Sequence, residues 1–247
     1  MTKKDREKYL NDAEARIKNY VKKWANSSKN RKEITDGIID VNSYLKSKLK
    51  ICWVLKEPYD ENDGKIGGFS LQDVVMDRLN EKDREYLKFG KTWTPIGYIS
   101  YSLLNGFLSY SKLQELVKLD KNTVMRSLLE ISVFNVGKMP SLTGPKSYDN
   151  VIKKLYKEWA PILNYQLLVY DPDVIIFGNT FHHFKDDLKS YKYRLHETKN
   201  CKYYLMNNKM IIDTWHPAKP SKTMRQEDYC NGIINSVRKW KAKGKKS

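Results

Sequence analysis

The sequence has few cysteines, few histidines and no long apolar run. Its three cysteines, Cys52, Cys201 and Cys230, lie far apart in a chain of 247 residues, with no C-x-x-C spacing. This pattern argues against a disulfide framework and against a cysteine-ligated cluster. No stretch reaches the ~18 apolar residues of a membrane-spanning helix, and the charged N-terminus lacks the apolar core of a signal peptide. We therefore expect a cytoplasmic protein with no membrane partner.

Acidic residues are scarce relative to basic ones. Lys and Arg total 46 against 29 Asp and Glu, which gives a formal net charge of +17. Such an excess attracts polyanions and favours salt-sensitive binding to phosphate backbones. The alternative is a lysine-rich composition that only makes a solvated basic surface. We expect DNA as the partner, bound by a monomer.

Hydrophobic residues make up 40% of the chain, enough for a packed core. Residues 3–24 have helical spacing of apolar side chains, and a second helix is predicted over about 31–47. We expect residues 1–48 to form an N-terminal helical extension, either separate or packed on the flank of the main domain. Residues 49–247 would form that main domain.

Beyond residue 49 the pattern alternates between short apolar runs and helical segments. Strands are predicted at 50–55, 130–136 and 173–178, with two more around an Asn-Asn turn in 202–215. Helices are predicted over about 70–128, with breaks near Gly90, Gly106 and Asp120, and over about 149–169 and 224–242. The alternation predicts an α/β fold, with a mostly parallel central sheet and helices on both faces. The ligand site would lie beyond the carboxyl ends of the strands.

Three polar loops leave predicted strand ends: "KEPYD", "NVGKMPS" and "HPAKPS". Glu57, directly before a proline, can hold a water molecule or face a developing cation; alternatively, it is an ordinary solvated glutamate. The Asn135 amide suits the Watson–Crick edge of a pyrimidine, unless it only forms a turn. His216 can donate to a carbonyl oxygen as negative charge grows there, unless it is a structural histidine bonded to backbone.

Two further features bear on ligands. Phe69 follows two glycines in "KIGGFS" and could stack on a flat base, although it could equally be a core phenylalanine. His182 and His183 are adjacent, and on a helix neighbouring side chains diverge by roughly 100°. We therefore expect them to share no metal, and we predict neither a metal nor a cofactor.

Together the three loops resemble the uracil-DNA glycosylase superfamily. "LKEPYD" is similar to the first motif GQDPYH, with a carboxylate before the proline and a tyrosine after it. Phe69 follows Tyr59 by ten positions, close to the spacing between the family's tyrosine and stacking phenylalanine. "FNVGKMP" resembles the N-x-x-K-x-P loop of the thermophile-type branch, and "HPAKPS" resembles HPSPLS. The resemblance covers about residues 49–240.

The sequence departs from the family pattern in its first motif. Leu55 and Lys56 replace Gly and Gln, Glu57 replaces Asp, and Asp60 replaces His. The segments between the motifs, 78 and 81 residues, are longer than in the most familiar branch. The iron–sulfur branch requires four cysteines, which this chain does not have. We therefore expect a divergent member without the cluster.

The resemblance implies catalysis by Glu57, which would stabilise a sugar cation and position water, and by His216, which would bind the departing base. It also implies a base pocket in which Asn135 reads the base edge, Phe69 stacks and Tyr59 forms a wall. Contacts with DNA would come from two loops, one after the strand that ends at Asn135 and one after the strand that leads to His216. The residues are Lys138, Ser141, Lys219, Pro220, Ser221 and Lys222.

The expected reaction is hydrolysis of an N-glycosidic bond after base flipping, leaving an abasic site. The target would be uracil or, since the first motif has drifted, a modified pyrimidine such as glucosylated hydroxymethylcytosine of phage DNA, removed in antiviral defence. Two alternatives stay open: a non-catalytic nucleic-acid-binding module on the same fold, and a hydrolase of free nucleosides. The net charge speaks against the latter.

Overall fold

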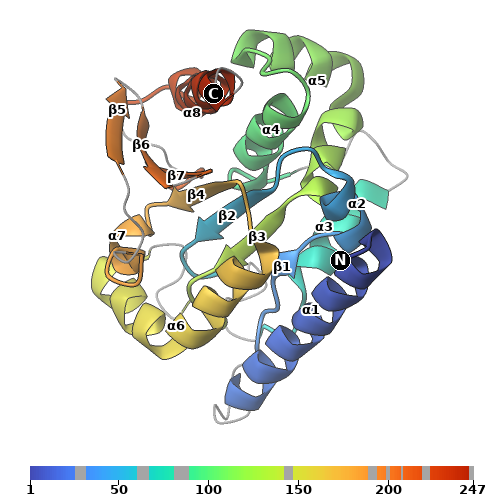
Figure 1. Cartoon of the computed structure of the whole chain (residues 1–247), viewed down its shortest axis with the longest axis vertical. Helices are drawn as coiled ribbons and strands as arrows, with labels where there is room; N and C mark the ends of the chain where they lie inside the picture. The colour runs from blue at the N-terminus through green and yellow to red at the C-terminus, as the bar shows by residue number, and fades with distance from the viewer. Residues whose placement is uncertain are drawn as a thin grey trace.

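The computed structural model describes residues 1–25, 32–59, 67–80, 89–141, 147–188, 194–198, 201–206, 208–218 and 223–244. These residues form an α/β fold around one mixed sheet (Figure 1). The predicted α/β class is confirmed. Among the described helices none is both long and apolar enough to cross a lipid bilayer.

The sheet has seven strands in the order β1-β3-β2-β4-β7-β6-β5. Its centre is parallel: β2 pairs with β3 and β4, and β4 pairs with β7. Its edges are antiparallel, because β1 pairs with β3, and β6 pairs with β7 and β5. The strands span Gly37–Ile38 (β1), Ile51–Leu55 (β2), Ser132–Asn135 (β3), Val174–Gly178 (β4), Arg194–Thr198 (β5), Cys201–Met206 (β6) and Lys209–Thr214 (β7).

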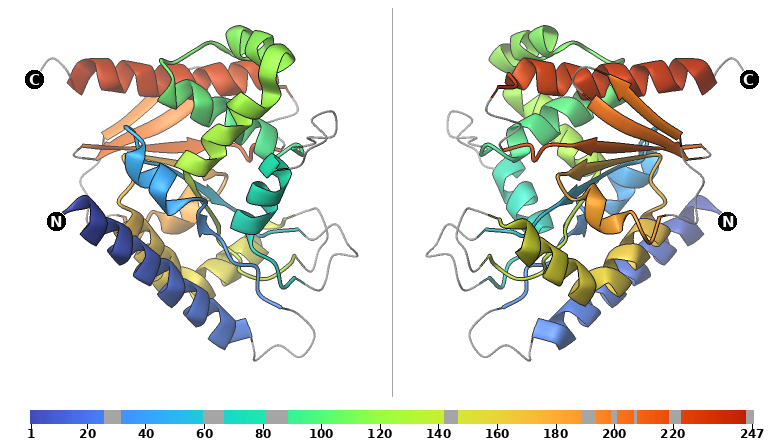
Figure 2. Two further views of the ribbon diagram at one scale, coloured as in Figure 1. Left: turned by 90° about the vertical axis from the view of Figure 1, so that its right-hand side faces the viewer. Right: turned by 90° about the vertical axis from the view of Figure 1, so that its left-hand side faces the viewer.

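Helices cover both faces of the sheet, so the molecule has three layers (Figure 2). One face packs against α3 (Leu71–Asn80), α4 (Trp93–Leu104), α5 (Tyr110–Met125) and α8 (Gln226–Gly244). The other packs against α1 (Lys3–Ala25), α2 (Val41–Lys46), α6 (Asp149–Tyr170) and α7 (Phe181–Phe184). The central strands are apolar throughout because both of their faces are buried: Trp53 enters one core and Val54 the other.

The first 48 residues belong to the same fold as the rest. Ile17 and Val21 of α1 are buried in the core shared with β3 and α6, and β1 adds an edge strand to β3. The Tyr44 hydroxyl of α2 donates to the carbonyl oxygen of Tyr170, at the end of α6. These contacts are those of the second arrangement expected for residues 1–48, packing on the flank of the main domain. The second helix is shorter than predicted, since α2 spans Val41–Lys46.

Candidate active site

The candidate site lies at the carboxyl ends of the parallel strands. The chain leaves β2 for β3 on one side and then crosses to β4 on the other, and such a reversal of strand order opens a crevice. A Cβ built on Gly178, at the end of β4, would lie 3.1 Å from Leu55 Cδ2, 3.2 Å from Pro217 Cδ and 3.6 Å from His216 Cα. The ends of β2, β4 and β7 are therefore closely packed together.

The loop after β2 is also tied to the loop after β3. The Gly137 N–H donates to the Lys56 carbonyl (3.0 Å), and the Ser141 N–H donates to the Pro58 carbonyl (2.9 Å). A Cβ on Gly137 would meet Glu57 Cβ at 3.0 Å, so only glycine permits this approach of the two loops. Two segments about 80 residues apart thus form one surface around the Glu57 backbone.

Glu57 is half-buried, and its two carboxylate oxygens differ. Oε1 accepts a 3.2 Å hydrogen bond from the Ser141 hydroxyl. Oε2 is buried and has no hydrogen-bond partner among the described residues. Burial raises the pKa of Glu57, and the Ser147 and Ser141 hydroxyls and the Lys56 charge offset part of that rise. An unpaired buried carboxylate oxygen is costly, and it is suited to hold water or face a cation.

His216 follows β7 and is held in one tautomer. Its Nδ1 accepts a hydrogen bond from the Ala218 N–H at 3.3 Å. In the neutral ring the proton is therefore on Nε2, which is left as a donor. Burial, with a smaller contribution from the Lys56 charge, lowers the pKa of His216 to about 4. At neutral pH this side chain is an uncharged hydrogen-bond donor.

Lys56 is the functional candidate that the sequence analysis missed. It directly precedes Glu57, and its positive charge acts on both Glu57 and His216. It also acts on Asp149 and His183, which lie at the starts of the helices after β3 and β4. The sequence did contain a clue, because Lys56 stands where the motif GQDPYH has an uncharged glutamine. Only the folded structure shows that the lysine charge acts on Glu57 and His216.

Asn135 and Lys138 are joined to a buried polar network rather than to Glu57. Asp36 accepts from the Asn135 backbone N–H at 2.7 Å and from its side-chain amide at 3.5 Å. The Lys138 ammonium is fully buried and lies 2.6 Å from Asp36 and 2.9 Å from the Gln166 side-chain oxygen. The prediction that Lys138 contacts DNA phosphates is therefore corrected, because its charge is neutralised in the core.

The remaining predicted residues have different environments. Ser141 was predicted to contact a DNA phosphate at the surface. In the structure its side chain is buried and its hydroxyl donates to Glu57 instead. Phe69 is half-buried, and its carbonyl accepts from the Thr35 N–H, which ties this loop to the segment before β1. Tyr59 is 43% exposed. The predicted DNA contacts Lys219, Pro220, Ser221 and Lys222 lie outside the described residues.

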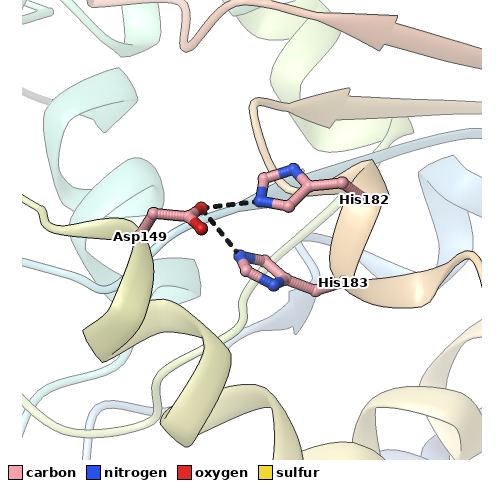
Figure 3. A group of neighbouring side chains, drawn as sticks. All are labelled: Asp149, His182 and His183. Carbon is pink, nitrogen blue, oxygen red and sulfur yellow. Dashed lines mark hydrogen bonds and ion pairs between the residues drawn. The ribbon is translucent and has the colours of Figure 1, made fainter.

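The adjacent histidines do converge, contrary to expectation. Figure 3 shows His182 and His183 directed at Asp149, which begins α6. Nε2 of His182 lies 2.6 Å and Nε2 of His183 3.3 Å from the same oxygen, Oδ1 of Asp149. Neighbouring residues of a helix diverge at their Cα atoms, but the two side chains of α7 (Phe181–Phe184) turn toward each other, and their ring centroids lie 3.9 Å apart.

A pocket of about 280 Å³ lies away from Glu57 and His216, neither of which lines it. It is found between α1, β1 and the start of α3, and Glu14 and Asp36 are among its lining residues. The Ile38 N–H donates to Glu14 at 3.1 Å. Burial raises the pKa of Glu14 to about 7, despite hydrogen bonds from Tyr170 and Ile38. This pocket borders the buried network and not the candidate active site.

No protein-family model matches the sequence, and no curated protein is significantly similar to it. The assignment of a function therefore depends on the residues and the geometry described above.

Proposed function

We propose that this chain is a monofunctional DNA glycosylase, a divergent relative of the uracil-DNA glycosylases. The observation that carries the proposal is the placement of two partly buried groups at one edge of the sheet, beyond the ends of β2 and β7, with β4 between them. One is a carboxylate, Glu57, with an unpartnered oxygen. The other is a neutral imidazole, His216, whose proton is on Nε2 because Nδ1 accepts from the Ala218 N–H.

These two groups match the charges that develop when an N-glycosidic bond breaks. The bonding electron pair leaves with the base, and the sugar becomes cation-like. Glu57 faces the sugar, stabilises the cation and accepts a proton from the water whose oxygen adds to the anomeric carbon. The Nε2–H of His216 donates to the base oxygen as negative charge grows there. A neutral imidazole can stabilise the departing base by this hydrogen bond while keeping its own proton throughout the reaction.

The surrounding residues support the same chemistry. Ser141 fixes the orientation of Glu57 through its hydroxyl. Lys56 adds positive charge beside both groups, which favours the charged form of Glu57 and the neutral form of His216. The net charge of +17 supports a polyanionic substrate. The base is uracil or a modified pyrimidine such as glucosylated hydroxymethylcytosine, stacked on Phe69. Reading of its edge by Asn135 would require the side-chain amide to exchange its 3.5 Å hydrogen bond to Asp36.

The test is incubation of the protein with duplex and single-stranded DNA carrying uracil, 5-hydroxymethylcytosine or its glucosylated forms. We expect alkali-sensitive abasic sites with one of these substrates, and mass spectrometry identifies the released base. Glu57→Gln and His216→Asn should abolish base release but retain DNA binding. The control His196→Ala, on the distant edge strand β5, should leave base release unchanged. Binding without base release on any substrate would instead support a non-catalytic nucleic-acid-binding module.

A further inference from the structure

We propose that Asp149, His182 and His183 form a binding site for one divalent transition-metal ion of the Zn²⁺ type. The carboxylate belongs to the first turn of α6, and both imidazoles belong to α7. Their ligand atoms all lie within 4.8 Å of one another. The site goes beyond the proposed glycosylase function and does not depend on it.

One pair of ligand atoms already has the spacing found in bound zinc, and a second pair is shorter. Zn–N and Zn–O bonds are about 2.0–2.2 Å, so two ligand atoms of one tetrahedral ion are roughly 3.3 Å apart. Nε2 of His183 lies 3.3 Å from Oδ1 of Asp149, which matches this spacing. Nε2 of His182 lies at 2.6 Å and would have to move outward. It can do so because the His182 and Asp149 side chains are 41% and 67% exposed.

His183 supplies the independent observation that points to a ligand. Its side chain is only 4% exposed. Its Nε2 faces Oδ1 of Asp149 at 3.3 Å, and within the described residues it makes no other polar contact. The ring is fixed in place by stacking on Tyr156, with centroids 6.3 Å apart and planes inclined by 23°. A buried imidazole nitrogen whose one contact is a long one to an exposed carboxylate is incompletely satisfied, and metal coordination would complete it.

The surrounding elements hold the two halves of the site firmly. Thr180, directly before α7, is buried and its hydroxyl donates to the Val54 carbonyl of β2 at 2.9 Å. The Ile152 N–H donates to the Tyr148 carbonyl at 3.1 Å, which closes the first turn of α6. A metal between these elements would therefore connect the segment after β3 to the segment after β4.

The ligand chemistry selects the class of ion. Two imidazoles and one carboxylate suit Zn²⁺, Ni²⁺, Co²⁺ or Fe²⁺, whereas Mg²⁺ and Ca²⁺ prefer oxygen ligands. Three protein ligands leave at least one coordination position for water or an anionic oxygen. The Lys56 charge disfavours a cation here, and the Asp149 carboxylate opposes that effect.

The test uses the full chain without a histidine tag, treated with chelator and then titrated with ZnCl₂ against a chromophoric competitor. We expect one ion per chain and no comparable binding of Mg²⁺. Asp149→Asn and His182→Ala change exposed side chains, so they should stay folded and weaken Zn²⁺ binding by about tenfold or more. His196→Ala, at a histidine on β5 whose ring stacks on Tyr203, is the matched control and should bind as the wild type does.

Two further readouts make the result decisive. Saturating Zn²⁺ should raise the melting temperature of the wild type and of His196→Ala, but not that of Asp149→Asn. The reason is that a ligand stabilises the folded protein only when it binds the folded state in preference to the unfolded state. Co²⁺ substitution should give visible absorption bands that disappear in His182→Ala. Absence of stoichiometric uptake, or uptake unchanged in Asp149→Asn, would overturn the proposal. Either result would leave the base-release assay, and with it the proposed function, unaffected.

Discussion

The Ser141 hydroxyl donates a 3.2 Å hydrogen bond to Oε1 of Glu57, although the two residues are 84 positions apart in the chain. This bond connects the loop after β3 to the loop after β2 and fixes one oxygen of the carboxylate. The other oxygen is left without a partner among the described residues. Ser141 is therefore a positioning residue for Glu57.

Replacing Ser141 by Ala should lower kcat for base release by about ten- to a hundredfold, with little change in DNA affinity. The hydroxyl also lowers the pKa of Glu57, so its loss should raise that pKa further. The proposed mechanism needs Glu57 as a carboxylate, so activity should fall as pH decreases through its pKa, and in Ser141→Ala the acidic limb should move to higher pH. A pH–rate profile of Ser141→Ala and Ser141→Thr measures this shift. An unmoved acidic limb in Ser141→Ala would contradict the positioning role.

His216 should stay neutral at and above about pH 6, with its proton on Nε2, since burial lowers its pKa to about 4. The chain has four histidines, so ¹⁵N-resolved NMR titration can follow each one, with His216→Asn assigning the signal. Lys56→Met should raise the pKa of His216, because the lysine charge disfavours the imidazolium. A ring that titrates near pH 6.5 in the wild type would exclude this prediction.

Glu14 should make the protein less stable as pH rises. Its pKa in the folded state, about 7, lies above the ordinary value of 4.5 for a glutamate side chain, because the carboxyl group is buried. The protonated form therefore stabilises the fold fully below about pH 4.5, and this contribution is lost as pH rises through about 7. We expect the free energy of unfolding to decrease by about 1–3 kcal/mol over this pH range. The lower part of this interval is expected, because Glu14 is partly exposed and solvent screens its charge.

Denaturant unfolding at several pH values measures this effect in Glu14→Gln, which should lose the dependence. Asp12→Asn is the matched control, since Asp12 is an exposed carboxylate on the same helix. Equal pH dependence of the wild type and Glu14→Gln would count against burial of this carboxylate.

The buried pair of Lys138 and Asp36 should be strongly coupled in stability. Asp36→Asn leaves the Lys138 ammonium in the core without its anion, and we expect it to destabilise the protein by about 3–5 kcal/mol. Asp36→Asn combined with Lys138→Met removes both charges and should cost less than the sum of the single changes. Additive losses in this double-mutant cycle would show that the two charges do not interact.

Most regular elements were predictable because their patterns are local. The sequence predicted α1 over 3–24 and α6 over 149–169, and the structure has them at Lys3–Ala25 and Asp149–Tyr170. Even the break at Asp120 is present, with φ −151° inside α5. By contrast, β1 spans two residues and β5 is polar and largely exposed, so neither has a hydrophobic period to detect.

The candidate site was only partly predictable. Glu57 and His216 were identified because each stands at the end of an apolar run, a position that a parallel sheet brings to one edge. The roles of Lys138 and Ser141 were mistaken because a sequence motif does not show on which side of a loop a side chain is buried. The pairing of Lys138 with Asp36 spans 102 positions, and no local pattern indicates it.

The sequence by itself determined the α/β class, the apolar strands, the amphipathic helices and the excess of positive charge, because each depends on composition or on short-range periodicity. The tertiary structure alone decided which polar groups meet. It buried Lys138 against Asp36, joined Ser141 to Glu57 and directed two adjacent histidines at Asp149. The physical reason is that burial and pairing of charges depend on contacts between strand ends and helix starts that are distant in the chain.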